Sequence, residues 1–417
     1  MCPLVSRFPT AAVIVITALI LPEPGGVAAE GVPTASTTTG GRSTDGDFAA
    51  AATLDAFLGE PLLIEMQELW KGRGGWGGVL SATDGTVIAI RSPGGGTIRR
   101  SHDGGRTWNA ETAIDPDGDP KAANGGNALL DEVTGDVLYV NPGERWLYRS
   151  RDCGATWTKE VIEVRPDGFG LVPKTEGAGA MQCGITLAFG PHRGRLLSPA
   201  RIMGPKDSND VPWRPYHYST AIWSDDGGRV WQTSKPFPVL GTGEAAIAEL
   251  SDGSLLYNSR EHMCRVNRFF DTSTDCGDLW IDARRSPDLP DGPRGTSYGL
   301  MAGMIRLPIR GRDILIYSSC DTDAGQMPAK VGASIAAGRE RTTVWASFDG
   351  GRTWPIKRLV TPGPGAYSCL GLGRTGTPGA GRIHLIFEGG PAGSHSAVQV
   401  ATFNLAWLLD GREVPAG

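Results

Sequence analysis

The sequence predicts an all-β fold, a six-bladed β-propeller with Asp-box hairpins. Three observations lead to this prediction: one eight-residue pattern recurs five times, short β-rich runs surround its copies, and no long amphipathic helix is recognisable. Repetition at this scale indicates units that each bury an apolar face against the next. A β-sandwich with coincidental turns is the alternative.

The repeated pattern is Ser-x-Asp-x-Gly-x-x-Trp, and its successive serines stand 49, 74, 49 and 74 residues apart. In such a turn the Asp can bind backbone N–H groups and the Gly tolerates unusual dihedral angles, while the Trp anchors the turn to the sheet. We expect a structural role for these boxes, because outer turns lie away from the central channel of a propeller. The copies begin at Ser101, Ser150, Ser224, Ser273 and Ser347.

Short runs rich in β-branched and aromatic residues precede most of the boxes and are bounded by Gly, Pro, Asp and Asn, which is typical of strands. The chain between residues 60 and 410 divides into six such units, and the sixth, after Trp354, carries no box. The runs are TVIAI, DVLYV, WLYR, YHYSTAIW and TTVWA.

Composition agrees with a single propeller. The 60 Gly and 30 Pro suit many turns. The mild net charge of −5, without a Lys/Arg run, argues against nucleic acid as a partner. We expect residues 1–29 to form a signal peptide, residues 30–55 a low-complexity linker and residues 56–412 the propeller domain.

The N-terminus has the features of an export signal. Arg7 supplies the positive start, an apolar stretch runs from Ala11 to Leu21, and Val27-Ala28-Ala29 offers a small-residue cleavage site. The apolar stretch is too short to span a bilayer. We therefore expect a secreted or periplasmic protein with no integral membrane segment after signal cleavage.

Export bears on the cysteines, because an oxidising compartment favours disulfides. Removal of Cys2 leaves six cysteines, which allow fifteen connectivities. The preferred pair is Cys264–Cys276, which would cross one hairpin. None of the cysteines has the spacing of a metal site and the histidines are scattered, so we expect no metal and no cofactor. The six are Cys153, Cys183, Cys264, Cys276, Cys320 and Cys369.

Four further segments make the chain similar to a known family. Together with the repeated boxes, they resemble segments of the bacterial sialidases (exo-α-neuraminidases), in the order in which that family has them. The resemblance covers the chain from about residue 60 to 410 and implies a six-bladed propeller that acts on sialic acid. The segments are GITLAFGPHRGRL (Gly184–Leu196), GTGEAAIAELSDGSLLYNSR (Gly241–Arg260), PGPGAYSCL (Pro362–Leu370) and FNLAWL (Phe403–Leu408).

The resemblance implies a chemistry that explains which residue types are needed. Sialic acid carries a carboxylate on its anomeric carbon, which would repel the carboxylate nucleophile of an ordinary retaining glycosidase. The family instead uses a Tyr hydroxyl, made nucleophilic by an adjacent Glu that takes its proton. Three Arg side chains bind the substrate carboxylate through the guanidinium fork. An Asp acts as general acid and then as general base.

Four of these positions carry over onto this sequence. Tyr367 in GAYSCL matches the nucleophile, and Glu244 in GTGEAAIAEL matches the base. Arg260, which ends LLYNSR, matches the second Arg, and Arg339 in GRERTT matches the third, with Arg341 as a nearby competitor. We expect the Tyr367 hydroxyl and the Glu244 carboxylate to share a hydrogen bond at one end of the central channel, with both arginines pointing to the same end.

Two positions depart from the family pattern. The first blade should carry Arg-Ile-Pro, but the stretch reads GRGGWGGVLSATDG, and Arg73 is the nearest candidate for the remaining clamp arginine. The loop that should hold the catalytic Asp reads RSPGGG, from Arg91 to Gly96, and contains no acid. The candidates to replace that Asp are Asp115, Asp117, Asp119 and Glu176.

The sequence thus predicts an exported exo-glycosidase of sialidase type, which hydrolyses terminal sialic acid or a related keto-deoxy sugar and has sialylated or related glycans as partners. Two alternatives stay open: a non-catalytic glycan-binding propeller that has lost the general acid, and a propeller enzyme that acts on another carbohydrate. Sugar binding measured beside sugar release separates the first two hypotheses, and a screen of glycan substrates separates the third.

Overall fold

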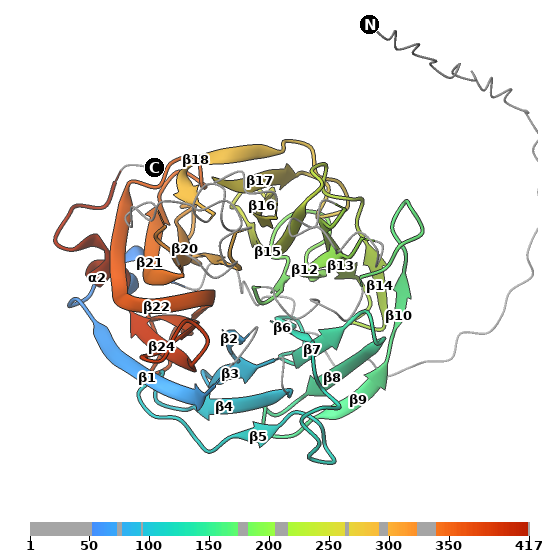
Figure 1. Ribbon diagram of the computed structural model, residues 1–417, viewed down its shortest axis with the longest axis horizontal. Coiled ribbons are helices and arrows are strands. Elements are labelled where there is room, and N and C mark those ends of the chain that lie inside the picture. Colours follow the sequence, from blue (N-terminus) through green and yellow to red (C-terminus); the bar gives the residue numbers. More distant parts are fainter. Residues whose placement is uncertain are drawn as a thin grey trace, which may run out of the picture. The chain divides into compact units, whose positions relative to one another are not determined.

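The computed structural model describes residues 52–72, 77–92, 95–173, 182–204, 216–262, 267–291, 299–322 and 339–415. These residues form a β-propeller, with sheets arranged around a centre (Figure 1). The all-β propeller expected from the sequence is therefore confirmed. Arg73, Glu176, Cys264 and the predicted signal peptide lie outside the described residues.

Three sheets are formed by the first part of the chain. Their strand orders are β2-β3-β4-β5, β6-β7-β8-β9 and β10-β14-β13-β12-β11. Neighbouring strands are antiparallel, except for the parallel pair of β10 and β14. The bounds are Gly78–Ser81 (β2), Val87–Arg91 (β3), Thr97–Ser101 (β4), Thr112–Ala113 (β5), Asn127–Leu130 (β6), Val137–Asn141 (β7), Trp146–Ser150 (β8), Thr158–Val161 (β9), Glu163–Arg165 (β10), Ile185–Thr186 (β11), Leu196–Ile202 (β12), Tyr218–Ser224 (β13) and Val230–Thr233 (β14).

Two sheets are formed by the rest of the chain. One has the order β15-β16-β17-β18, and the other has seven strands in the order β1-β24-β23-β22-β21-β20-β19. The bounds are Leu63–Lys71 (β1), Thr242–Glu249 (β15), Leu255–Glu261 (β16), Asn267–Ser273 (β17), Arg284–Pro290 (β18), Gly303–Arg306 (β19), Leu315–Cys320 (β20), Glu340–Ser347 (β21), Ile356–Leu372 (β22), Ile383–Gly389 (β23) and Ala397–Phe403 (β24).

The seven-stranded sheet divides at its longest strand. Residues 356–364 of β22 pair with β21, whereas residues 365–372 pair with β23. The sheet therefore consists of two four-stranded arrangements that share β22. Strands from different sheets meet at the centre of the propeller. There β2 packs against β6 and β22, and β15 packs against β19.

Most strands are buried on both faces, because each sheet packs between two neighbours. Every residue of β7, β16 and β23 is buried, and Val, Ile, Leu, Phe and Tyr supply much of their side-chain surface. Charged residues are also buried at the ends of two of these strands, Arg260 and Glu261 in β16 and Glu388 in β23. Buried charges must be paired or hydrogen-bonded, so these strand ends mark a polar site inside the propeller.

The five boxes form the turns that follow the third strands. They begin at the final residues of β4, β8, β13, β17 and β21. In the first box the Asp103 carboxylate accepts hydrogen bonds from the Ser101 hydroxyl at 2.8 Å and from the Thr107 backbone N–H at 2.9 Å. The Ser101 hydroxyl oxygen in turn accepts from the Gly105 N–H at 2.8 Å. These bonds hold the turn, as the sequence predicts.

The two ends of the described chain close the ring, because β1 pairs antiparallel with β24. Asn404, directly after β24, joins this pairing to the helix α2 (Leu405–Leu409). Its side-chain oxygen accepts from the Leu62 N–H at 3.0 Å and from the Trp407 N–H at 2.9 Å, while its Nδ2 donates to the Glu60 carbonyl at 2.8 Å. One amide thus caps a helix and fixes the entry of β1.

The propeller begins earlier than the boundary expected at residue 56. The Ala52 N–H donates to the Pro308 carbonyl at 3.3 Å, and the helix α1 (Leu54–Phe57) buries Phe57 in the core. Residues 52–55, expected in the linker, therefore pack on the propeller.

The helices α1 and α2 are short. Across the part of the chain that the structure describes, no helix has the length and apolar character needed to cross a membrane.

The expected disulfides are absent among the described cysteines. Cys276 is a free thiol, so the expected pair with Cys264 is not formed. The reason is local: Cys276 follows the Asp of a box with a φ of 60°, and its side chain packs in the apolar cluster that contains Leu197 and Trp280. The sulfur atoms of Cys183 and Cys369 lie 4.0 Å apart as thiols.

We predict that Asn404→Ala lowers the free energy of unfolding by about 1–3 kcal/mol, because it removes a helix cap and leaves backbone groups of the ring closure without their partner. Urea unfolding followed by Trp fluorescence measures the change. Asn404→Asp keeps the acceptor oxygen and should lose less. Equal stability of Asn404→Ala and the wild type would contradict this role of Asn404.

Candidate active site

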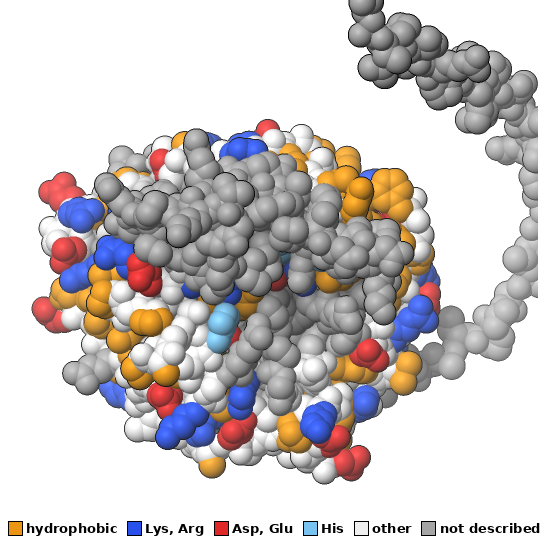
Figure 2. Space-filling model, viewed as in Figure 1, with side chains coloured by type: hydrophobic (Ala, Val, Ile, Leu, Met, Phe, Trp, Pro, Cys, Tyr) orange, Lys and Arg blue, Asp and Glu red, His pale blue; other side chains and the backbone are white. Residues whose placement is uncertain are grey.

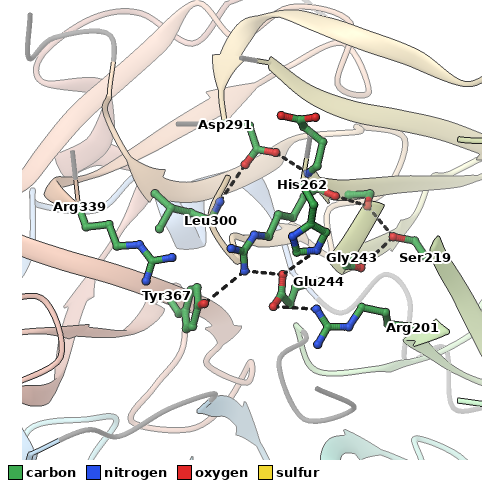
Figure 3. A network of polar contacts seen from close by, with 12 residues as sticks. Arg201, Ser219, Gly243, Glu244, His262, Asp291, Leu300, Arg339 and Tyr367 are labelled. Atoms are coloured by element: carbon green, nitrogen blue, oxygen red, sulfur yellow. Dashed lines mark hydrogen bonds and ion pairs between the residues drawn. The ribbon is translucent and has the colours of Figure 1, made fainter. Parts of the chain in front are cut away.

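Polar residues from several sheets meet at one end of the strands (Figure 3). Because neighbouring strands are antiparallel, the start of a first strand, the end of a second and the start of a third lie at the same end of a sheet. Glu244 lies near the start of β15, and Arg260 and Arg201 lie near the ends of β16 and β12. Tyr367 lies near the start of the part of β22 that pairs with β23, and Arg339 directly precedes β21. The boxes, which follow third strands, lie at the opposite end.

Glu244 is at the centre of this group, with only 2% of its surface exposed. Its Oε1 accepts a hydrogen bond from Arg201 Nη1 at 3.1 Å, and its Oε2 accepts one from Arg260 Nη1 at 2.6 Å. Burial alone would raise the pKa of this carboxyl, but the charges of Arg260 and Arg201 outweigh burial and hold the pKa below its ordinary value of 4.5. Glu244 is therefore a carboxylate at neutral pH.

His262 completes the surroundings of Glu244, with its Nε2 3.9 Å from Glu244 Oε2. A Cβ atom at Gly243 would overlap with this ring, so the Gly of the GTGE segment makes room for it. Burial, together with the positive charge of Arg260, lowers the pKa of His262 well below its ordinary value. His262 is therefore neutral beside the ion pairs.

Arg260 connects Glu244 with Tyr367. The Nη1 atom that donates to Glu244 also donates to the Tyr367 hydroxyl oxygen at 3.2 Å, and the guanidinium carbon lies 5.6 Å from the centre of the Tyr367 ring. The carboxylate and the hydroxyl are close neighbours because both contact one nitrogen atom. Arg260 thus bridges them, in place of the direct hydrogen bond expected from the sequence.

An ion pair behind the site fixes the backbone next to Arg260. Arg268 Nη1 donates to Asp291 Oδ1 at 2.7 Å, and Asp291 Oδ2 accepts from the Glu261 backbone N–H at 2.7 Å. The Leu300 N–H also donates to Asp291 Oδ1, at 3.0 Å. Since Glu261 directly follows Arg260, this pair holds the end of β16 in position.

Arg339 lies against the same tyrosine, with its guanidinium carbon 5.0 Å from the Tyr367 ring centre. It is 9% exposed, and its Nη1 contacts His395 Nε2 at 3.0 Å. No carboxylate of the described chain lies within ion-pair distance of Arg339, and its Nε has no hydrogen-bond partner. The competitor Arg341 has no contact with Tyr367 of this kind. Arg339 therefore carries an unpaired positive charge beside the tyrosine.

The acid-free loop between β3 and β4 is covered by the following connection. The Gly96 N–H donates to the Pro120 carbonyl at 2.7 Å, and Cβ atoms at Gly95 and Gly96 would overlap with Pro120 and Ala123. Gly95 and Gly96 are therefore needed because the segment with the alternative acids packs directly on them.

Among these alternative acids, Asp115 is engaged elsewhere. It is buried and accepts a hydrogen bond from the Tyr148 hydroxyl at 2.7 Å. Asp117 and Asp119 are exposed, and the Asp119 carboxylate accepts from the Lys121 backbone N–H at 2.9 Å. Glu176 lies outside the described residues. The exposed pair thus stays available as candidates for the acid, whereas Asp115 has a structural contact.

The structure brings together four of the five residues expected in the site, namely Glu244, Arg260, Arg339 and Tyr367. Arg73, the fifth, lies outside the described residues. The sequence reasoning missed four side chains that contact the group. The sequence carried a signal for Arg201 and Glu388, because each is a charged residue inside an otherwise apolar strand. The four are Arg201 in LLSPARI, Glu388 in IHLIFEG, His262 and His395.

The fold and the site define a propeller with an arginine-rich cluster built around a tyrosine and a glutamate. Two guanidinium groups pair with Glu244, whereas that of Arg339 has no carboxylate of a described residue within ion-pair distance, so the cluster suits a ligand that carries a carboxylate. Acidic and basic side chains alternate around the rest of the described surface on the face seen in Figure 2.

Comparisons with known proteins agree with this class. No protein-family model matches the chain. It is 29% identical over 396 residues to a sialidase of Micromonospora viridifaciens, which covers 84% of this chain and 55% of that protein. A sialidase of Bacteroides fragilis is 27% identical over 312 residues, which covers 66% of this chain and 51% of that protein.

Among solved structures, the Hadza microbial sialidase Hz136 has a similar fold, with a TM-score of 0.57, 22% identity, and coverage of 80% of this chain and 66% of that one. The chain spans about half the length of the curated relatives it matches. The chain is thus similar to bacterial sialidases in sequence and shares the propeller fold with solved sialidases, in agreement with the resemblance of its segments.

We predict that Glu244→Gln destabilises the fold by about 3–5 kcal/mol at neutral pH, because it leaves two buried guanidinium groups without a carboxylate. The folded-state pKa of Glu244 lies below the unfolded value, so its contribution is present above about pH 4.5 and is lost as the pH falls further. Urea unfolding at several pH values checks both points. A stability difference that stays constant down to the most acidic pH would contradict the ion-pair assignment.

Proposed function

We propose that the chain is an exported glycoside hydrolase of sialidase type, which releases terminal sialic acid or a related keto-deoxy sugar from glycans. The observation that carries this proposal is the meeting of the Tyr367 hydroxyl and the Glu244 carboxylate on one nitrogen of Arg260, beside the unpaired charge of Arg339. A neutral nucleophile next to a guanidinium group without a carboxylate partner suits a sugar whose anomeric carbon carries a carboxylate. The names of the relatives support the same substrate class.

Each side chain has a role in this proposal. Arg339 and Arg260 bind the sugar carboxylate and so hold the anomeric carbon at the Tyr367 hydroxyl. Tyr367 attacks that carbon while Glu244 takes its proton and the bond from the carbon to the aglycone oxygen breaks, which gives a glycosyl-tyrosine intermediate and a free aglycone that takes up a proton from water. A second water molecule then attacks the same carbon and gives up one proton to solvent, the bond to the Tyr367 oxygen breaks, and Glu244 returns its proton to that oxygen.

The charge of Arg260 also affects when Glu244 can accept the proton of Tyr367. In the free protein its charge lowers the basicity of Glu244 and its Nη1 lies between the two oxygens. A bound sugar carboxylate would compensate that charge and give the guanidinium a second partner. The basicity of Glu244 would then rise, so substrate binding itself would prepare Glu244 to accept the proton.

We also propose six blades for the propeller. The division of the seven-stranded sheet at β22 supports this number, because each half has four strands and the other four sheets supply one blade each. In this arrangement the sixth blade takes its outer strand, β1, from the N-terminal end of the domain.

One observation favours a second candidate, a propeller that binds glycans without cleaving them. The loop expected to hold the general acid has none, and its space is taken by the segment that follows β5. A sialoside that binds but is not released would support this candidate over the hydrolase.

We predict that the mature protein cleaves a fluorogenic aryl sialoside and that Tyr367→Phe loses at least about 10²-fold in kcat, because the phenyl ring has no nucleophilic oxygen. Initial rates measure the change. Tyr216→Phe, at an exposed tyrosine, serves as the matched control. Equal rates for Tyr367→Phe and the wild type would contradict the assignment of Tyr367.

The missing acid leads to a separate prediction. A phenolate leaves without protonation, whereas a sugar alkoxide depends on general-acid assistance of about 10²–10⁴-fold. The chain should therefore cleave aryl sialosides far better than sugar-linked ones. If both substrates turn over equally, an acid is present, and the variant Asp117→Asn or Asp119→Asn that selectively loses the sugar-linked substrate identifies it.

A further inference from the structure

Arg339 is held by a chain of three polar side chains. Its Nη1 lies 3.0 Å from His395 Nε2, and His395 Nδ1 lies 2.7 Å from Glu388 Oε2. Glu388 is on β23 and is 1% exposed, while His395 is in the turn between β23 and β24. The three residues therefore connect the buried side of the last sheet with the pocket around Tyr367.

The chemistry of these groups determines the state of the imidazole. A guanidinium group can only donate hydrogen bonds, so Nε2 of His395 must be the acceptor. The hydrogen of the neutral ring is then on Nδ1, from which it is donated to the Glu388 carboxylate. Glu388 thus fixes both the tautomer and the orientation of the ring, and the ring orients Arg339.

The interposed ring has an electrostatic consequence. A direct contact between Glu388 and Arg339 would form an ion pair and compensate the arginine charge. The neutral ring instead provides an acceptor without compensating this charge at close range. The Nε of Arg339 is also buried and has no hydrogen-bond partner. The guanidinium is therefore oriented by a neutral acceptor while its charge stays available to a ligand.

We propose that His395 is a positioning residue for Arg339, and that it keeps this arginine oriented and uncompensated for the carboxylate of the sugar. This inference rests on the proposed function, because it assigns the role of one more residue in the same pocket. His395 touches the Tyr367 ring edge-on, with ring centres 6.0 Å apart, so it also borders the space where the sugar would lie.

Three groups face the His395 ring, namely Arg339 before β21, Tyr367 on β22 and Glu388 on β23. The contact with Arg339 requires an unprotonated Nε2, because a hydrogen on that atom would remove the acceptor.

The test compares His395→Ala and His395→Gln with the wild type in kcat and KM for a fluorogenic aryl sialoside. His395→Ala should raise KM by about 10-fold or more, the usual effect of losing a hydrogen bond to a charged group, with kcat within about 3-fold. The amide oxygen of His395→Gln can accept from Arg339, so this variant should recover most of the affinity.

His192→Gln is the matched control, because His192 contacts Arg195 Nη2 at 2.8 Å and lies 3.7 Å from the Asp225 carboxylate, away from the pocket. It should keep the wild-type KM. An unchanged KM in His395→Ala would overturn the proposal, as would a His395→Gln variant that is no better than His395→Ala.

Calorimetry with free sialic acid separates this inference from the proposed function. If the wild type binds the sugar without cleaving a sialoside, the hydrolase proposal fails, and weaker binding by His395→Ala still supports the role of His395. If the wild type cleaves the sialoside and His395→Ala binds sialic acid as tightly as the wild type, only the role of His395 is overturned. If the wild type neither binds nor cleaves, both proposals fail.

Discussion

The pairing of β1 with β24 is the constraint on which the rest of the structure depends. A propeller blade buries its faces only against neighbouring blades, so an open ring would leave two faces in water. Joining a strand from the N-terminal end of the domain to the last strand removes that opening. The site depends on this closure, because Tyr367 on β22 and Glu244 on β15 reach one nitrogen atom only when their sheets are held around a common centre.

Burial of charge inside this ring gives the site its character. A carboxylate and three guanidinium groups are almost fully removed from water, and such charges persist only when partners compensate them. Glu244 compensates Arg201 and Arg260, whereas Arg339 contacts a neutral imidazole. The site is therefore stable without a ligand, yet one guanidinium group keeps the capacity to bind a carboxylate.

Much of the fold was predictable from the sequence, because it depends on local chemistry. Ser101 and Asp103 form their turn with residues at most four positions away, so the repeated pattern alone identifies the hairpins. The carried-over positions Glu244, Arg260, Arg339 and Tyr367 could be proposed for a similar reason, since each lies in a short segment that resembles the family, and the structure places the four side chains close together. The cysteine pairing failed, because the direction of the Cys276 side chain depends on a left-handed turn and on packing.

The sequence by itself determined the propeller, its repeated turns and the residue types of the pocket. Only the tertiary structure decided which atoms meet: that Arg260 lies between Tyr367 and Glu244, that Arg201 shares the same carboxylate, and that His395 holds Arg339. These contacts join strands that are far apart in the chain, and no local pattern encodes the distance between them. The physical reason is that closure of the ring, rather than any single segment, sets the separation of side chains from different sheets.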